Sequence, residues 1–302
     1  MTAMTVRSRT ELAYPARPGS NSLQVGLVQS APRAQEIDAN ASGLRDLMGL
    51  VGDVDLIVTP ELGLQGYAVP ATTPPVPLTR QDVVDTHART GAVVGMGFAE
   101  TRPDGMPFNS YALIGDAATE VQRKLHPVAT APFDEHMVYA GGDVLRASSI
   151  AGVPVATVVC NDMWHPVVPW LAVQQGAEVL VVPVASAESA APGVKAVWDA
   201  ILRHTAQVLQ CYVVFVNRCG TDGSMEFWGG SRVIGPDGEL MVQLGRTEAV
   251  NQVTLDLAML RRLRRQTPIL GEVRTDFVLH DLTTLTDNTL GVDTDGPVPA
   301  RV

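Results

Sequence analysis

The sequence predicts an α/β protein with mixed β-sheet, and three observations lead to that prediction. Short β-branched runs bounded by Gly, Pro or Asp alternate with helical patterns along the chain. Apolar residues make up 46% of the 302 residues and charged residues 18%, which is typical of strands covered on both faces. The tripeptide PDG occurs at 103–105 and at 236–238, each time between strand-like runs, and indicates two hairpins within the alternating pattern.

The expected elements follow one another in order. The strand-like segments are LQVGLVQ (23–29), VDLIVTP (54–60), AVVGMGFA (92–99), NSYALIG (109–115), VPVATVVC (153–160), EVLVVPVA (178–185), YVVFVNR (212–218), GSRVIG (230–235) and VNQVTLDL (250–257). Helical periodicity lies between them, at about 36–51, 80–90, 166–176, 194–210 and 256–265.

The chain is expected to form one folded domain over residues 23–280. No low-complexity linker divides it, and the Pro-rich piece VPATTPPVP at 69–77 is short enough to be a loop. Residues 1–22 contain Arg, Ser, Pro and Gly without a continuous apolar stretch, which indicates a flexible tail and not a signal peptide. Residues 281–302 are rich in Thr, Asp and Pro, and we expect a C-terminal tail there.

Charge and composition exclude several classes of partner. The formal net charge is −10 and the pI is near 5.0, so the overall field repels nucleic acid and anionic membranes and favours a small-molecule partner. No apolar run approaches the roughly 20 residues of a membrane span. The three cysteines, at 160, 211 and 219, do not have the spacing of a zinc site or of a disulfide framework. The six histidines do not have the spacing of metal ligands. We therefore expect reduced thiols, a cytoplasmic protein and no metal.

Four side chains that could carry chemistry stand where apolar segments give way to loops, the place where open α/β sheets hold their sites. They are Glu61, Lys124, Glu135 and Cys160. A free thiol is only about 3% thiolate at neutral pH and needs a base or a positive charge beside it. A carboxylate in a dry pocket can be that base. A lysine can hold the anionic tetrahedral intermediate, a contribution on the order of 3 to 4 kcal/mol. Glu, Lys and Cys together therefore suffice for acyl transfer.

Each of these residues also has an ordinary structural interpretation. Cys160 could be a small core residue at the end of a buried strand, as we expect of Cys211 and Cys219. Lys124 alone would be a surface lysine, and Glu135 alone a solvated loop carboxylate. The occurrence of all four in one order and on one scaffold favours catalysis.

The ordered motifs PELGLQGY, RKLHP, VVCNDMWHP, QGAEVLVVPVAS, NRCG and GGSRVIGPDGEL resemble the nitrilase superfamily of carbon-nitrogen hydrolases. The resemblance covers roughly residues 23–280. It implies a single-domain, four-layer αββα sandwich with two mixed β-sheets. It also implies that the protein forms a homodimer or a higher homo-oligomer and needs no cofactor or metal.

The resemblance also implies a role for each candidate. Glu61 falls on the general base, Lys124 on the lysine that stabilises the oxyanion, and Cys160 on the nucleophile. Glu135, which precedes the turn GGD at 141–143, falls on the supporting glutamate. The backbone N–H of Asn161 would be the second oxyanion donor. In this interpretation a thioester forms on the cysteine and water hydrolyses it.

The residues after the nucleophile are most similar to the amidase and N-carbamoyl amino acid amidohydrolase branches. Nitrile-cleaving members typically have Trp-Glu where this chain has Asn161 and Asp162. Carbamoylases specific for amino acids clamp the substrate carboxylate with arginines where this chain has Met163 and Trp164. We therefore expect an apolar or aromatic acyl group without a carboxylate at that place. The further substrate-binding candidates are His126, His165, Tyr67 and Ala185, and Trp198, Arg203 and Trp228 are possible pocket or interface residues.

Three alternatives remain open from the sequence. An amine could intercept the thioester in place of water, which would make the protein an acyltransferase or an amide-forming enzyme. That enzyme would use the same four residues as the hydrolase. A true nitrilase is the second alternative. A non-catalytic binding protein of the same fold is disfavoured, because loss of activity generally leaves a catalytic residue replaced and all four are present here.

Overall fold

The computed structural model describes residues 20–67, 75–86, 91–103, 105–116, 118–131, 133–190 and 192–290. Within them the chain forms two six-stranded sheets and one small two-stranded sheet. Almost all of the expected N-terminal tail, most of the loop expected at 69–77, and residues 291–302 lie outside the described residues.

The first sheet has the order β14-β1-β2-β3-β4-β5. Its strands are β1 (Ser22–Gln29), β2 (Leu56–Val58), β3 (Val93–Glu100), β4 (Phe108–Ile114), β5 (Thr119–Arg123) and β14 (Ala249–Asp256). The second sheet has the order β13-β12-β9-β8-β7-β6. Its strands are β6 (Ala147–Ile150), β7 (Val153–Thr157), β8 (Val179–Val184), β9 (Tyr212–Asn217), β12 (Arg232–Ile234) and β13 (Leu240–Gln243). The small sheet pairs β10 (Cys219–Asp222) with β11 (Met225–Trp228).

Both large sheets are mixed, as the sequence predicted. Strands β1, β2 and β3 run parallel, and so do β7, β8 and β9, while the outer strands of each sheet pair antiparallel. Both PDG turns join antiparallel neighbours, β3 to β4 and β12 to β13, so the two predicted hairpins are confirmed.

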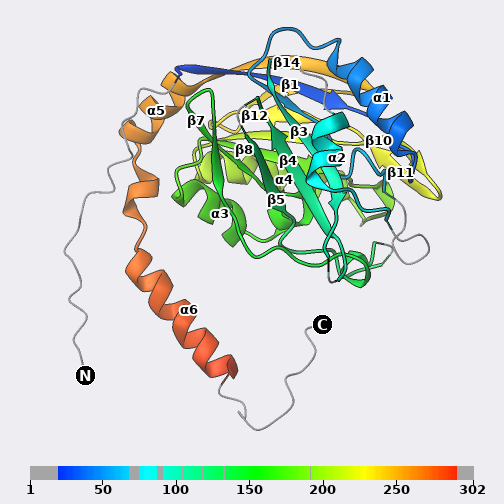
Figure 1. The fold of residues 1–302 in the computed structure, drawn as a ribbon. Coiled ribbons are helices and arrows are strands. Elements are labelled where there is room, and N and C mark those ends of the chain that lie inside the picture. Colours follow the sequence, from blue (N-terminus) through cyan, green and yellow to red (C-terminus); the bar gives the residue numbers. More distant parts are fainter. Residues whose placement is uncertain are drawn as a thin grey trace.

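Helices cover the outer faces of the two sheets (Figure 1). The helices are α1 (Ile37–Met48), α2 (Arg80–Thr86), α3 (Val167–Gln174), α4 (Val194–Val208), α5 (Leu257–Gln266) and α6 (Thr275–Leu290), with short 3-10 helices η1 (Glu135–Met137), η2 (Cys160–Trp164), η3 (Glu188–Ala190) and η4 (Ile269–Glu272). Helices α1 and α2 pack on the first sheet, and α3 and α4 on the second. The result is the expected four-layer αββα sandwich.

The alternation of side chains in β1 shows how the layers are specified. Leu23, Val25 and Leu27 point into the core shared by the two sheets, whereas Val28 packs with α1. A strand between two layers must be apolar on both faces, since side chains alternate along it. This explains why the central strands appear in the sequence as nearly continuous apolar runs.

Two expected boundaries differ in the structure. Strand β7 ends at Thr157, so Cys160 belongs to η2 and not to the strand. Helix α6 runs through position 281, where the sequence predicted the polar tail to begin. Leu279, Leu282 and Leu285 recur at a helical spacing within the Thr- and Asp-rich stretch, and composition alone does not reveal such a pattern. No helix in the described part of the chain is both long and apolar enough to cross a bilayer.

Candidate active site

Cys160 stands on a tight turn that follows β7. Its φ is +46°, in the left-handed region of backbone conformation that residues other than glycine rarely adopt. The backbone turns at this point and begins η2, and the thiol lines a cavity of about 210 Å³. Cys160 is therefore presented by a turn at the end of a buried strand, and not packed within the strand.

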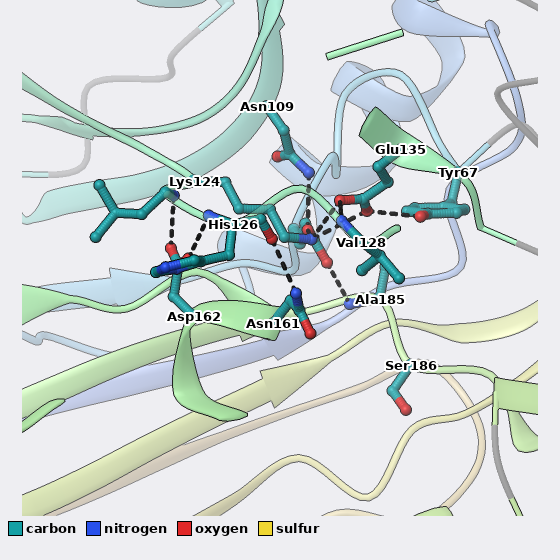
Figure 2. A network of polar contacts seen from close by, with 12 residues as sticks. Tyr67, Asn109, Lys124, His126, Val128, Glu135, Asn161, Asp162, Ala185 and Ser186 are labelled. Carbon is teal, nitrogen blue, oxygen red and sulfur yellow. Dashed lines mark hydrogen bonds and ion pairs between the residues drawn. The ribbon is translucent and has the colours of Figure 1, made fainter. Parts of the chain in front are cut away.

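The turn is tied to the segment that follows β5. The buried carboxylate of Asp162 accepts the backbone N–H groups of Leu125 at 2.9 Å and His126 at 2.8 Å, and it contacts His126 Nδ1 at 2.9 Å. The Asn161 side chain donates to the His126 carbonyl at 3.0 Å. Figure 2 shows these bonds next to Lys124. Since Lys124 immediately precedes Leu125 and His126, and Asn161 immediately follows Cys160, the bonds fix the lysine relative to the cysteine.

Glu61 follows β2 and is buried. Its Oε1 accepts hydrogen bonds from Asn109 Nδ2 and Lys124 Nζ, each at 2.8 Å, and its Oε2 accepts the Ala185 N–H at 2.8 Å. Gly97 of β3 allows this turn to lie against the strand, because a Cβ there would come within 2.4 Å of the Leu62 nitrogen. The hydrogen bonds to this carboxylate therefore come from the start of β4, the residue after β5 and the residue after β8.

Lys124 lies between two carboxylates (Figure 2). Its Nζ is 2.8 Å from Glu61 Oε1 and 2.7 Å from Glu135 Oε2, and none of the three side chains is more than 1% exposed. Glu135 is held from its other side by the Tyr67 hydroxyl at 2.6 Å and by the Val128 N–H at 3.0 Å. The structure thus brings together all four residues that the sequence singled out.

Burial sets the charge state of this cluster. Burial raises the pKa of Glu61, although Lys124 opposes the shift. It also raises the pKa of the Cys160 thiol well above its ordinary value, and the negative charge of Glu61 adds to that effect. Burial alone would lower the pKa of Lys124, but the charges of Glu135 and Glu61 outweigh it and hold the pKa well above its ordinary value. At neutral pH the lysine is therefore charged and the thiol keeps its proton, so attack by sulfur requires a base.

The cavity beside Cys160 is apolar over most of its wall. It is lined by Tyr67, Val128, Thr130, Phe133, Glu135, Cys160, Asn161, Trp164, Ala185, Ser186, Ala190, Val194 and Trp198. Four of the predicted substrate-binding residues are in this set, namely Tyr67, Asn161, Trp164 and Ala185. Trp198, which the sequence left as a pocket or interface residue, also lines it and meets Trp164 edge to face, with ring centroids 5.6 Å apart.

The other three predicted substrate-binding residues lie elsewhere. Met163 is buried and lines a separate groove between α3 and α4. The rings of His126 and His165 stack at 3.9 Å, and His126 is bound to Asp162, so neither ring lines the cavity. Consecutive residues on η2 point in different directions, so Trp164 can reach the cavity while its neighbours on both sides do not.

A family model for carbon-nitrogen hydrolases matches residues 24–265 of the chain. The chain belongs to this family. An (R)-stereoselective amidase of a Pseudomonas species is 31% identical to this carbon-nitrogen hydrolase over 260 residues, which are 83% of this chain and 92% of the relative. A protein of Pseudomonas protegens described as a hydrolase in the pqqF 5′ region is 26% identical over 267 residues, 86% of this chain and 92% of its own.

Solved structures show the same fold. A CN-hydrolase superfamily protein from Xanthomonas campestris superimposes with a TM-score of 0.74 at 23% identity, covering 84% of this chain and 98% of the other. A nitrilase-superfamily amidase from Nesterenkonia does so with a TM-score of 0.72 at 20% identity, covering 87% and 98%.

Sequence reasoning missed two residues that position the candidate catalytic groups. Asn109, the first residue of the predicted strand NSYALIG, binds Glu61, and Asp162 holds the segment after Lys124. In the sequence, each of these polar residues stands next to an apolar segment, Asn109 at its start and Asp162 just after its end. That position was the feature from which a role in the site could have been predicted. In the described part of the chain no cluster of His, Cys, Asp or Glu could hold a metal ion.

Proposed function

We propose that the protein is an amidase that hydrolyses a small non-peptide amide through a thioester on Cys160. The observation that carries the proposal is the buried Glu61–Lys124–Glu135 cluster beside a thiol at the wall of a cavity. The thiol is protonated at rest, and the negative charge of Glu61 is near enough to raise its pKa, so Glu61 is the group placed to accept the thiol proton.

The first half of the proposed reaction forms the thioester. Sulfur attacks the amide carbonyl carbon while Glu61 takes the thiol proton. The carbonyl oxygen becomes an oxyanion between Lys124 Nζ and the backbone N–H of Asn161, which donates no other hydrogen bond among the described residues. Each such donor is worth about 100- to 1000-fold in rate. Glu61 returns the proton to the nitrogen, the carbon–nitrogen bond breaks, and ammonia or an amine leaves.

The second half regenerates the enzyme. Glu61, again a carboxylate, takes a proton from a water molecule that attacks the thioester carbon. The same two donors hold the second oxyanion. The carbon–sulfur bond then breaks, the carboxylic acid leaves, and the proton returns to the Cys160 sulfur. One water molecule is consumed and no net change occurs on the protein.

The cavity wall supports a neutral acyl group. Among the described residues that line it, no Lys or Arg is present, and the one anion, Glu135, is already bound by Lys124, Tyr67 and Val128. A substrate carboxylate would be buried without a cation, which is strongly unfavourable. An uncharged apolar or aromatic amide fits better than an N-carbamoyl amino acid.

Intact-mass measurement tests the proposal. After brief incubation with a panel of amides, the wild-type protein is expected to carry an acyl adduct that maps to Cys160, and the acid product is expected to accumulate. The Cys160→Ala variant should show neither. Turnover by that variant, or an adduct at another residue, would contradict the mechanism.

We also infer that the protein functions as a homodimer. Helix α6 extends away from the sandwich (Figure 1), and its Phe277 and Leu279 are 55% and 68% exposed. Val167 and Leu171 of α3 are also exposed. A second copy would cover these apolar surfaces, whose burial favours association. Light scattering is expected to give twice the chain mass, and a charged substitution such as Leu279→Lys should shift it toward the monomer.

A further inference from the structure

Ser186 places a hydroxyl in the cavity wall with an unusual set of partners. Its Oγ accepts the indole N–H of Trp198 at 3.1 Å and the indole N–H of Trp228 at 3.2 Å. An indole N–H can only donate, and a hydroxyl oxygen has two lone pairs. Both lone pairs are therefore occupied, and the hydroxyl can act toward any further group only as a donor.

The remaining hydroxyl hydrogen has no acceptor among the described residues. Ser186 is 5% exposed and lines the same cavity as Cys160. A buried donor without a partner is unfavourable, so such a group indicates a partner that the protein itself does not provide. The cavity is the accessible space beside this hydroxyl.

The surroundings hold the hydroxyl in place. The Ser186 N–H donates to Asn217 Oδ1 at 2.8 Å, and the Ser186 carbonyl accepts from Asn217 Nδ2 at 3.2 Å. Phe215 packs against both indoles, with ring centroids 5.2 Å from Trp198 and 5.6 Å from Trp228. The donor therefore has a fixed position, which a contact that selects between substrates requires.

The preceding residue connects this donor to the catalytic cluster. The Ala185 N–H donates to Glu61 Oε2 at 2.8 Å. Ser186 is the next residue in the chain, and its side chain makes no contact with the carboxylates of the site (Figure 2). One rigid segment after β8 thus holds the general base and the hydroxyl. A substrate bound to Ser186 would be placed at a set distance from Glu61 and Cys160.

We propose that Ser186 determines specificity by donating a hydrogen bond to a neutral acceptor on the acyl group, such as an ether or keto oxygen. This inference rests on the proposed amidase function and narrows its substrate class to amides whose acyl group carries such an acceptor. A carboxylate is disfavoured, because one neutral donor does not compensate for burying a charge. An acyl group of the same shape without the acceptor would leave the hydroxyl unsatisfied.

Binding to inactive protein tests the assignment without relying on catalysis. In the Cys160→Ala background, calorimetry would compare cyclopentanecarboxamide with tetrahydrofuran carboxamides whose ring oxygen is adjacent to the substituted carbon or one position removed, each enantiomer separately. We expect one of the oxygen-containing rings to bind about two- to tenfold more tightly than the carbocycle, the range of one net hydrogen bond.

Substitutions at Ser186 should then remove or keep that preference. Ser186→Ala is expected to bring the affinity ratio to about one, and Ser186→Thr, which keeps a hydroxyl, to retain a preference. Ser110→Ala is the matched control, because it removes a buried hydroxyl that binds Glu100 and does not line the cavity, and it should keep the wild-type ratio. If Ser186→Ala does not fold, Ser186→Cys supplies a much weaker donor and should also lose most of the preference.

The outcomes separate this inference from the proposed function. Equal affinities for all the rings, no binding of any, or a preference that survives both Ser186→Ala and Ser186→Cys would overturn the role of Ser186. Hydrolysis of the same amides by the wild-type protein tests the amidase proposal by itself. Selective binding without turnover would leave Ser186 as a specificity residue and contradict the amidase function.

Discussion

Lys124 Nζ lies 2.7 Å from Glu135 Oε2, and these side chains are 0% and 1% exposed. Because Glu61 also contacts the ammonium, the cluster contains one positive and two negative charges in a buried space. The lysine therefore has two tasks. It stabilises two buried carboxylates in the resting protein, and in the proposed reaction it also stabilises the oxyanion.

Replacing Lys124 by Ala should impair both stability and activity. Two carboxylates would be left buried without a cation, and breaking a buried pair of this kind costs about 3 to 5 kcal/mol. We expect the free energy of unfolding, measured by chemical denaturation, to fall by that amount and turnover to fall more than about 100-fold. Lys195→Ala, which removes a solvent-exposed lysine paired with Glu188, is the control and should change neither appreciably. A Lys124→Ala protein as stable as the wild type would show that the carboxylates are not both charged.

Two substitutions at Cys160 should separate chemistry from backbone strain. Both Cys160→Ala and Cys160→Gly remove the thiol and are expected to abolish turnover. The φ of +46° disfavours any side chain, whereas glycine adopts it freely, so the glycine variant should be about 1 kcal/mol more stable than the alanine variant. Denaturation midpoints of the two variants measure the difference. If alanine were the more stable, the left-handed turn would not be present in solution.

Much of the fold could be predicted because the central strands are apolar on both faces. Val25 and Val181, for example, lie in continuous apolar segments, and such segments indicate strands that are buried between two layers. Strand β5, with the sequence TEVQR, lies at a sheet edge and has a single apolar residue, so it carries no comparable pattern. The positive φ at Cys160 was also hidden, because no glycine or asparagine marks that position.

The candidate site was predictable in its chemistry and less so in its geometry. Glu61, Lys124, Glu135 and Cys160 were found from residue types in a fixed order, and the structure brings them together. Which residues next to Cys160 reach the cavity depends on the direction in which each side chain of η2 points. A 3-10 helix of five residues is too short to show a hydrophobic periodicity from which that direction could be predicted. The dual acceptor role of Ser186 depends on two indoles 30 positions apart, Trp198 and Trp228, which meet only in the folded chain.

Met163 and Trp164 should respond differently to replacement by Ala. Trp164 lines the cavity, so Trp164→Ala enlarges it and is expected to shift the ratio of kcat/KM toward larger acyl groups. Met163 is 2% exposed and does not line the cavity, so Met163→Ala should cost about 2 to 5 kcal/mol of stability and leave that ratio unchanged. A panel of linear amides of increasing length measures the ratio. A change in selectivity in the Met163 variant instead would move the substrate site to the other side of η2.

The pH dependence of kcat/KM should report the protonation of Glu61. Its pKa is raised above the ordinary value of 4.5 by burial, and the base must be unprotonated to accept the thiol proton. Activity is therefore expected to fall as pH decreases through a midpoint above 4.5.

Asn109→Asp places a second carboxyl group where the amide now binds Glu61 at 2.8 Å, so the like charge should raise the pKa of Glu61 further and move the midpoint to higher pH. Asn40→Asp, at a buried asparagine bonded to the carbonyls of Arg33 and Leu64, should leave the midpoint unchanged. A midpoint at or below 4.5, or one that Asn109→Asp does not move, would mean that a group other than Glu61 is the base.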